Sequence, residues 1–222
     1  MSIQANALQA ELQLGAQQLG LHLPDPCLSQ LLDYLALLHK WNKVYNLTAV
    51  RDAQQMLTHH LLDCLAALPA FTGARRVLDV GSGGGLPGVV IAIWATHSAP
   101  AMQIDVIDTV RKKTAFLTQV KAELKLANLT VHTGRVEQLT MEGAYDVITS
   151  RAFAALNDFV AWSSHLLVEG GRMIAMKGPA YEPELAALPM GWRVEKIEAL
   201  EIPAMTGERF LITLKRAHDN QH

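Results

Sequence analysis

Apolar residues recur at helical spacing through the first third of the chain. A first stripe follows Asp25-Pro26, which is typical of a helix start, and its members are Leu28, Leu31, Leu32, Leu35 and Leu38. A second stripe follows Asp52, with Gln55 placed as in a capping box, and its members are Leu57, Leu61, Cys64, Leu65 and Leu68. The sequence therefore predicts helices up to about Leu68.

The segment between the two stripes has a different pattern. Residues 41–48, Trp-Asn-Lys-Val-Tyr-Asn-Leu-Thr, mix aromatic and polar side chains with poor helix formers, which predicts a loop. Pro69 and Gly73 follow the second stripe and mark a boundary. We therefore expect an N-terminal helical extension over residues 1–69 and a second domain over residues 70–222.

From Arg75 onward, short apolar runs alternate with helical patterns. Five strands are expected, at residues 76–80, 104–107, 130–132, 145–149 and 172–176, the last after a turn at Gly170-Gly171. Helices are expected between them, at residues 89–94, 111–127 and 156–167. Strands that alternate with helices in this way predict a parallel, doubly wound sheet.

The C-terminal pattern departs from that alternation. Two runs typical of strands, residues 192–199 and 209–215, leave no room for a helix between them, which predicts an antiparallel hairpin. A mostly parallel, Rossmann-like sheet that ends in such a hairpin is the plan of class I S-adenosylmethionine-dependent methyltransferases, more than that of NAD-binding domains. The expected fold is therefore α/β, of the class I methyltransferase type, with an N-terminal helical extension.

Composition narrows the class of protein. Half of the 222 residues are hydrophobic and 18% are charged, as in folded globular proteins. Cys27 and Cys64 are too few for a disulfide framework and are expected to be reduced, which fits the cytoplasm. No apolar run is long enough to cross a membrane, and no Cys/His spacing indicates a metal site. The net charge of −2 argues weakly against a nucleic acid partner.

A glycine-rich loop, Asp79-Val80-Gly81-Ser82-Gly83-Gly84-Gly85, follows the first expected strand. Asp79 at the strand end can lie near a cationic part of a ligand, and the backbone can approach that ligand closely at Gly81, Gly83 and Gly85. A second register of the same loop, Gly83, Gly85 and Gly88, also matches the dinucleotide pattern. This register begins late relative to the strand, and it places Pro87 inside the close-packed turn. The loop therefore favours S-adenosylmethionine and leaves NAD open.

Other candidate residues follow strand ends, where open α/β sheets bind their ligands. Asp108 follows the second strand and can accept hydrogen bonds from ribose hydroxyls in either cofactor, or cap the next helix. Val136 and Glu137 follow the third strand, where a backbone amide could contact an adenine edge, unless this is an ordinary surface loop. Arg151 follows the fourth strand and is expected near the methyl donor or the acceptor, or else at the surface.

These residues, taken with others, resemble the small-subunit ribosomal RNA methyltransferase G family, also called glucose-inhibited division protein B. The resemblance spans nearly the whole chain and rests on residues 38–48, 60–63, 79–88, 135–137, 150–154 and 177–178. It implies N7 methylation of one guanine in 16S rRNA, in a bacterial cytoplasm, with S-adenosyl-L-methionine as cofactor. The family's cofactor positions correspond to Gly81, Leu86, Val136, Glu137 and Arg151.

An RNA substrate requires local positive charge more than a positive total. Residues 75–135 hold eight Arg or Lys residues against four acids, which allows a basic face or merely a solvated one. Arg151 and Lys177 are candidates for holding an RNA phosphate or a base oxygen, and replacing Arg151 by Ala is expected to lower methylation strongly and leave the fold intact. Residues 41–45, with Lys40 and Lys43, form either an RNA-contacting loop or an aromatic plug between the extension and the sheet.

Several alternatives stay open from the residues alone. The methyl acceptor could be a small molecule or a protein, the chain could be an NAD-dependent oxidoreductase, or it could be a sensing module that binds a nucleotide and transfers nothing. The leading hypothesis is a monomeric rRNA (guanine-N7)-methyltransferase without a metal. Its expected partner is 16S rRNA or the small ribosomal subunit, with no membrane contact.

Overall fold

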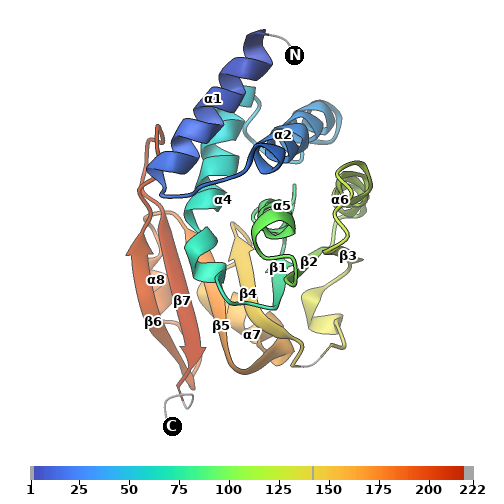
Figure 1. Cartoon of the computed structure of the whole chain (residues 1–222). Helices are drawn as coiled ribbons and strands as arrows, with labels where there is room; N and C mark the ends of the chain where they lie inside the picture. Colours follow the sequence, from blue (N-terminus) through green and yellow to red (C-terminus); the bar gives the residue numbers. More distant parts are fainter. Residues whose placement is uncertain (1–2, 142, 218–222) are drawn as a thin grey trace.

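A computed structural model describes residues 3–141 and 143–217 of the chain. Its centre is a seven-stranded sheet in the order β3-β2-β1-β4-β5-β7-β6 (Figure 1). The strands are β1 (Arg76–Val80), β2 (Gln103–Asp108), β3 (Leu129–Thr133), β4 (Tyr145–Arg151), β5 (Leu167–Lys177), β6 (Trp192–Ala199) and β7 (Phe210–Arg216). Strands β1 to β5 are parallel, whereas β7 runs antiparallel to both β5 and β6. The predicted class I methyltransferase fold with its terminal hairpin is confirmed.

Helices precede the sheet and alternate with its strands. The extension consists of α1 (Ile3–Gln18), α2 (Asp25–Tyr45), α3 (Ala53–Met56), a π-helix (Leu57–Leu62), α4 (Asp63–Ala66) and a 3-10 turn (Leu68–Phe71). The remaining helices are α5 (Gly88–Ser98), α6 (Arg111–Glu123), α7 (Leu156–Ser163) and α8 (Glu182–Leu185), with 3-10 turns at Val136–Gln138 and Ser164–Leu166. Within residues 3–141 and 143–217, no helix combines the length and apolar character needed to cross a membrane.

Two hydrophobic cores lie on opposite faces of the sheet, because successive strand residues point to opposite sides. Val77 of β1 belongs to the core that α2, the π-helix, α5 and α6 share, whereas Leu78 belongs to the core beneath α7. The extension is thus packed into the same core as half of the sheet. The division between residues 69 and 70 stays a prediction. Residues 1–2, 142 and 218–222 of the two predicted ranges lie outside the described residues.

The predicted loop between the two leucine stripes is wrong over its first five residues. Helix α2 continues to Tyr45 and ends where Asn46 adopts a left-handed conformation, with φ of 51°. The Trp41 ring packs on the Phe116 ring of α6, with 5.4 Å between centroids, and the buried Asn42 side chain makes two hydrogen bonds of 2.9 Å to the backbone of the following turn. Contacts with distant residues therefore outweigh weak helix propensity here.

Two other predicted boundaries also differ. Helix α6 ends at Glu123 instead of Ala127, because Lys125 has a φ of 54° that a helix does not allow. Strand β5 begins at Leu167, so the preceding helix is shorter than predicted, and the expected glycine turn at residues 170–171 lies inside the strand. A Cβ on Gly171 would lie 3.0 Å from the Asp146 carbonyl oxygen, so this glycine permits close pairing of β5 with β4 where their register shifts.

Candidate cofactor-binding site

A pocket of about 370 Å³ opens at the carboxyl ends of the parallel strands. It lies beside the ends of β1, β2 and β4 and the loop after β3, and its volume is in the range of about 300–1,000 Å³ that small-ligand sites occupy. Of the predicted site residues, Gly81, Asp108, Val136 and Glu137 line it. The strand ends that the sequence singled out therefore do meet at one hollow.

The glycine loop needs glycine at two positions for different reasons. Gly81 has a φ of 68°, and a Cβ there would lie 2.2 Å from Cδ2 of Phe153, so glycine lets that ring pack on the loop. Gly85 has a φ of 95°, and its Cβ would lie 2.5 Å from Cγ2 of Val89 and 2.8 Å from Cδ2 of Leu117. The loop is therefore pressed between the pocket wall and the helices behind it.

Asp108 organises the pocket side of the loop. Its Oδ2 accepts a hydrogen bond of 3.0 Å from the Gly83 backbone N–H, and its Oδ1 accepts one of 2.8 Å from Val110. The Lys113 ammonium lies 3.5 Å from Oδ2. A carboxylate offers about four lone-pair sites, so Asp108 keeps accepting capacity on the pocket side.

Asp79 is fully buried at the end of β1, one residue before the pocket wall begins at Val80. Its Oδ2 accepts a hydrogen bond of 2.8 Å from the Gly88 N–H, whereas Oδ1 has no hydrogen-bond partner among the described residues. Burial raises the pKa of this carboxyl to about 7, and the bond from Gly88 only partly offsets that rise. A buried oxygen without a partner is expensive, so this site favours a cationic or donor group.

Val136 and Glu137 begin the 3-10 turn after β3, and both line the pocket. Val136 is buried, whereas Glu137 is exposed and lies 3.9 Å from the Arg135 guanidinium. Leu86, predicted as a cofactor position, is buried in the core of the extension and is not part of the pocket wall. The structure thus brings Val136 and Glu137 to the pocket and leaves Leu86 behind the loop.

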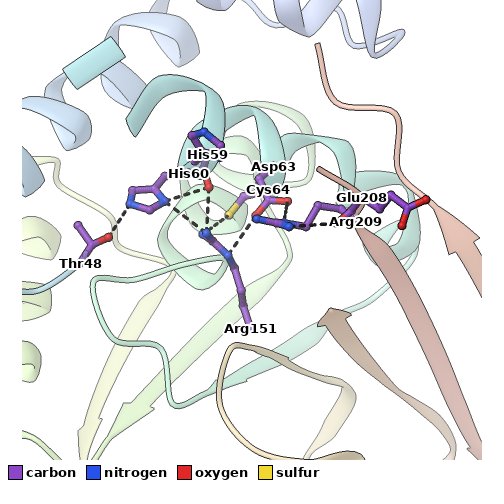
Figure 2. A network of polar contacts seen from close by, with 8 residues as sticks. All are labelled: Thr48, His59, His60, Asp63, Cys64, Arg151, Glu208 and Arg209. Carbon is purple, nitrogen blue, oxygen red and sulfur yellow. Dashed lines mark hydrogen bonds and ion pairs between the residues drawn. The ribbon is translucent and has the colours of Figure 1, made fainter. Parts of the chain in front are cut away.

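Arg151 ends β4, and its side chain is not part of the pocket wall but reaches the π-helix and α4 (Figure 2). Its Nη2 donates a hydrogen bond of 2.9 Å to the His59 carbonyl oxygen and lies 3.3 Å from Nδ1 of His60. Its Nε lies 3.0 Å from Oδ2 of Asp63, and its Nη1 lies 3.9 Å from the Cys64 sulfur. Most of the guanidinium donors are therefore already used inside the protein.

The Arg151 network extends to two further segments, as Figure 2 shows. Arg209, just before β7, places Nε 3.7 Å from the other Asp63 oxygen, and Nε2 of His60 lies 2.8 Å from the Thr48 hydroxyl. Burial, with the Arg151 charge, lowers the pKa of His60 to about 4, so this imidazole is neutral at physiological pH. None of His60, Asp63 and Arg209 was predicted from sequence as a site residue, although the first two lie within the stretch of family resemblance at residues 60–63.

Lys177, at the end of β5, is also held internally. Its ammonium donates a hydrogen bond of 2.7 Å to the Ala154 carbonyl oxygen and pairs with Glu184 at 2.8 Å. It is absent from the pocket wall. Both residues predicted to hold RNA therefore have partners within the chain, and contact of either one with RNA stays a prediction.

Two aromatic side chains that the sequence analysis did not select form one wall of the pocket. Phe153 packs on Gly81, and its ring lies 5.7 Å from that of Trp162 in an edge-to-face arrangement. The preceding residue, Ala152, has a φ of 52°, which is strained for a residue with a Cβ. The position of Phe153, two residues after the end of β4, was a usable signal, whereas that of Trp162 depends on how α7 packs.

Comparison with known proteins supports the same class. The family model described as rRNA small subunit methyltransferase G matches residues 27–212. A protein named Ribosomal RNA small subunit methyltransferase G from Herminiimonas arsenicoxydans is 60% identical over 210 residues, covering 95% of this chain and 96% of that protein. A protein of the same name from Janthinobacterium sp. (strain Marseille) is 58% identical, with 95% and 96% covered.

Solved structures agree in fold. A SAM-dependent methyltransferase from Aquifex aeolicus aligns with a TM-score of 0.56 at 16% identity, covering 81% of this chain and 97% of that chain. TrmN from Thermus thermophilus aligns with a TM-score of 0.55 at 18% identity, covering 72% and 53%. The family match overrules the alternative of an NAD-dependent oxidoreductase. With relatives of this identity along nearly its whole length, the chain belongs to the rRNA small subunit methyltransferase G family.

Proposed function

We propose that this chain transfers a methyl group from S-adenosyl-L-methionine to N7 of one guanine in 16S rRNA. The observation that carries the proposal is the pocket at the carboxyl ends of β1, β2 and β4, with Asp108 in its wall and buried Asp79 beside it. Membership of the family supplies the acceptor, because the relatives are named for the small-subunit rRNA.

The residues present at the pocket fit this cofactor. Asp108 has lone pairs left for ribose hydroxyls. The N–H groups of Val136 and Glu137 lie in the first turn of a 3-10 helix, where amides lack intrahelical partners and can meet an adenine edge. The unpaired Oδ1 of Asp79 suits the ammonium group of the methionine part.

When bound, the cofactor supplies an electrophilic methyl group on a sulfonium. Guanine N7 carries a lone pair and no proton, so the chain needs no general base for this transfer. Its residues act by holding the two reactants in line, and proximity with alignment can lower a barrier by as much as about 7–11 kcal/mol. The rigid glycine loop, fixed through Asp108 and Gly85, serves that alignment.

Arg151 and Lys177 act as positioning residues in this proposal. Arg151 directly precedes Ala152 and Phe153 of the pocket wall, and Lys177 holds the Ala154 carbonyl. The two cations thus fix both ends of the same short segment, residues 152–154, from opposite sides. We favour this role over the sequence-based role of holding an RNA phosphate, because for the latter each side chain would first have to leave its present partners.

We further propose that the chain acts as a monomer in a bacterial cytoplasm, without a metal ion. Its partner is 16S rRNA, either free or within the small ribosomal subunit. A small molecule or a protein as acceptor would suit an enclosed cavity, whereas this pocket has an aromatic wall with partly exposed Trp162 that a flipped base can reach.

The test uses S-adenosylmethionine labelled on its methyl group. The chain is incubated with small ribosomal subunits, or with protein-free 16S rRNA, from a strain that lacks the modification, and the label is mapped to a nucleotide and a ring atom. We expect one labelled guanine, at N7. Binding of S-adenosylhomocysteine in calorimetry without label in either RNA would refute the acceptor and leave the cofactor assignment standing.

A further inference from the structure

The C-terminal end of α2 and the N-terminal end of α6 lie at the same end of the molecule. Gln30, near the start of α2, donates a hydrogen bond of 2.7 Å to the Leu124 carbonyl oxygen at the end of α6, whereas Trp41 packs on Phe116. The two helices therefore run antiparallel, and the last turn of α2 approaches the first turn of α6. That first turn includes Lys113, which lines the cofactor pocket, so this end of the molecule adjoins the pocket mouth.

The last turn of α2 exposes two large apolar side chains. Val44 is 69% exposed and Tyr45 is 40% exposed. The Tyr45 ring lies 5.1 Å from the Trp41 ring, which in turn packs on fully buried Phe116. The turn that follows is held by the Asn42 side chain. A ring supported in this way loses little freedom when a base stacks on it, so it is a ready stacking platform.

Cations gather around the same two helix ends. Lys43 is exposed in the last turn of α2, and Arg111 and Lys112 are exposed in the first turn of α6, whereas exposed Lys40 lies beside Glu123 and Leu124 at the other end of α6. None of Lys43, Arg111 and Lys112 makes an ion pair with another residue of the described ranges 3–141 and 143–217. A helix N-terminus carries partial positive charge and disfavours cations, and α6 has no acid in its first turn. These cations therefore lower the stability of the free protein, and a bound anion removes that cost.

We propose that this surface, the α2–α6 tip formed by Lys43, Val44, Tyr45, Arg111 and Lys112, binds the single-stranded RNA next to the target guanine. The inference rests on the proposed function and names the surface that delivers its substrate. Phosphates lie against the three cations, and a neighbouring base stacks on Tyr45. Continuity with the pocket through Lys113 places this strand where the guanine must enter.

The experiment compares two variants of the tip with two controls. Tyr45→Ala removes the ring, and Lys43→Gln combined with Lys112→Gln removes two cations. Leu14→Ala on α1, where the side chain is 57% exposed, and Lys125→Gln at the opposite end of α6 are matched controls. Affinity for protein-free 16S rRNA and for small subunits is measured across a salt series, and S-adenosylhomocysteine binding is measured by calorimetry.

We expect Tyr45→Ala to weaken RNA binding by about 5- to 150-fold, the range that corresponds to about 1–3 kcal/mol for stacking one base. Tyr45→Phe should restore binding, because the ring remains. The double lysine variant should make the slope of log affinity against log salt shallower by about 1.4, since each single-strand phosphate contact contributes about 0.7. Both controls should bind RNA as the wild type does, and all variants should bind S-adenosylhomocysteine normally.

Two results would overturn the inference. One is wild-type affinity and wild-type salt dependence in both tip variants. The other is a loss of affinity confined to intact subunits, since the tip would then contact a ribosomal protein. Failure of the proposed function looks different, because the wild-type chain itself would then place no label in rRNA.

Discussion

Removing either charge of the Arg151–Asp63 pair should destabilise the fold, which revises the expectation from sequence that replacing Arg151 leaves the fold intact. Removing both charges should cost less than the two single changes together. The pair joins β4 to the start of α4 at 3.0 Å, with 17% of the Arg151 side chain and 1% of the Asp63 side chain exposed. Removing one partner of a buried pair costs about 3–5 kcal/mol, because the other charge is left without compensation. Arg209 still lies 3.7 Å from Asp63 and compensates part of its charge, so we expect the lower end, about 3 kcal/mol, for Arg151→Met. Asp63→Asn takes the carboxylate away from both guanidinium groups, so its cost should be about 3 kcal/mol or more.

The double variant differs because it leaves neither partner charged. Burial raises the pKa of Asp63 even though Arg151 and Arg209 pull it down, so an ionised carboxylate is costly at this position. When a neutral amide replaces that carboxylate and an apolar side chain replaces the guanidinium, the cost is avoided. The two single effects together should therefore exceed the double effect by about 2 kcal/mol.

The assay is urea unfolding of the wild type, the two single variants and the double variant. For a chain of this size, about 3 kcal/mol corresponds to a fall in Tm of about 6–12 °C, which a thermal melt can check. The surface pair Lys196–Glu198, with side chains 61% and 36% exposed, is the control, and the corresponding Lys196→Met and Glu198→Gln changes should each cost less than about 1 kcal/mol. Additive effects of the two buried changes, or an Arg151 variant as stable as the wild type, would refute the reasoning.

Four further predictions concern the glycine loop. Because burial raises the pKa of Asp79 to about 7, affinity for S-adenosylhomocysteine, with its ammonium group, should rise as the carboxylate forms near neutral pH, and Asp79→Asn should remove that rise in calorimetry. The stability of the ligand-free protein should depend on pH in the opposite direction, because the fold favours the protonated carboxyl of Asp79. The free energy of unfolding should therefore fall as pH rises from about 4 to about 7, and the Asn variant should lack this fall in urea titrations. Gly81→Ala puts a Cβ 2.2 Å from Phe153, so cofactor affinity in calorimetry should fall about tenfold or more. Adding Phe153→Ala should restore part of that affinity. An unchanged affinity in the Gly81 variant would contradict this prediction. Tyr34→Phe removes the buried hydrogen bond of 2.6 Å to the Gly84 carbonyl, so the free energy of unfolding in urea should fall by about 1–3 kcal/mol, and a wild-type value would show that the bond is dispensable.

The sheet was predictable from sequence because central strands such as β1 and β2 are buried on both faces and appear as short apolar runs between helical patterns. The C-terminal hairpin followed from the short distance between its two strands. The end of α2 was not predictable, because the contact that extends the helix joins Trp41 to Phe116, 75 positions later. The turn predicted at Gly171 was wrong, because this glycine permits close pairing of two strands and does not mark a turn.

The residues of the pocket were likewise predictable only in part. Asp108 is the last residue of β2, and Val136 and Glu137 lie in the loop after β3, so the general rule for open α/β sheets was enough to select them. Trp162 was missed because it lies on a helix, and only the packing of α7 brings it to Phe153. A rule based on strand ends cannot recognise a residue that reaches the site from an adjacent helix.

Arg151 and Lys177 show what a motif position does and does not establish. Both were predicted to contact the substrate, which stays a prediction, and both side chains are held within the chain, Arg151 by the His59 carbonyl oxygen and Lys177 by the Ala154 carbonyl oxygen. Arg151 has its partners in the helical extension, from which Tyr34 also holds the glycine loop. The extension therefore contributes to the geometry of a pocket that it does not line. A fragment of residues 70–222 would contain every residue of the pocket wall and still lack the contacts that hold that wall in place.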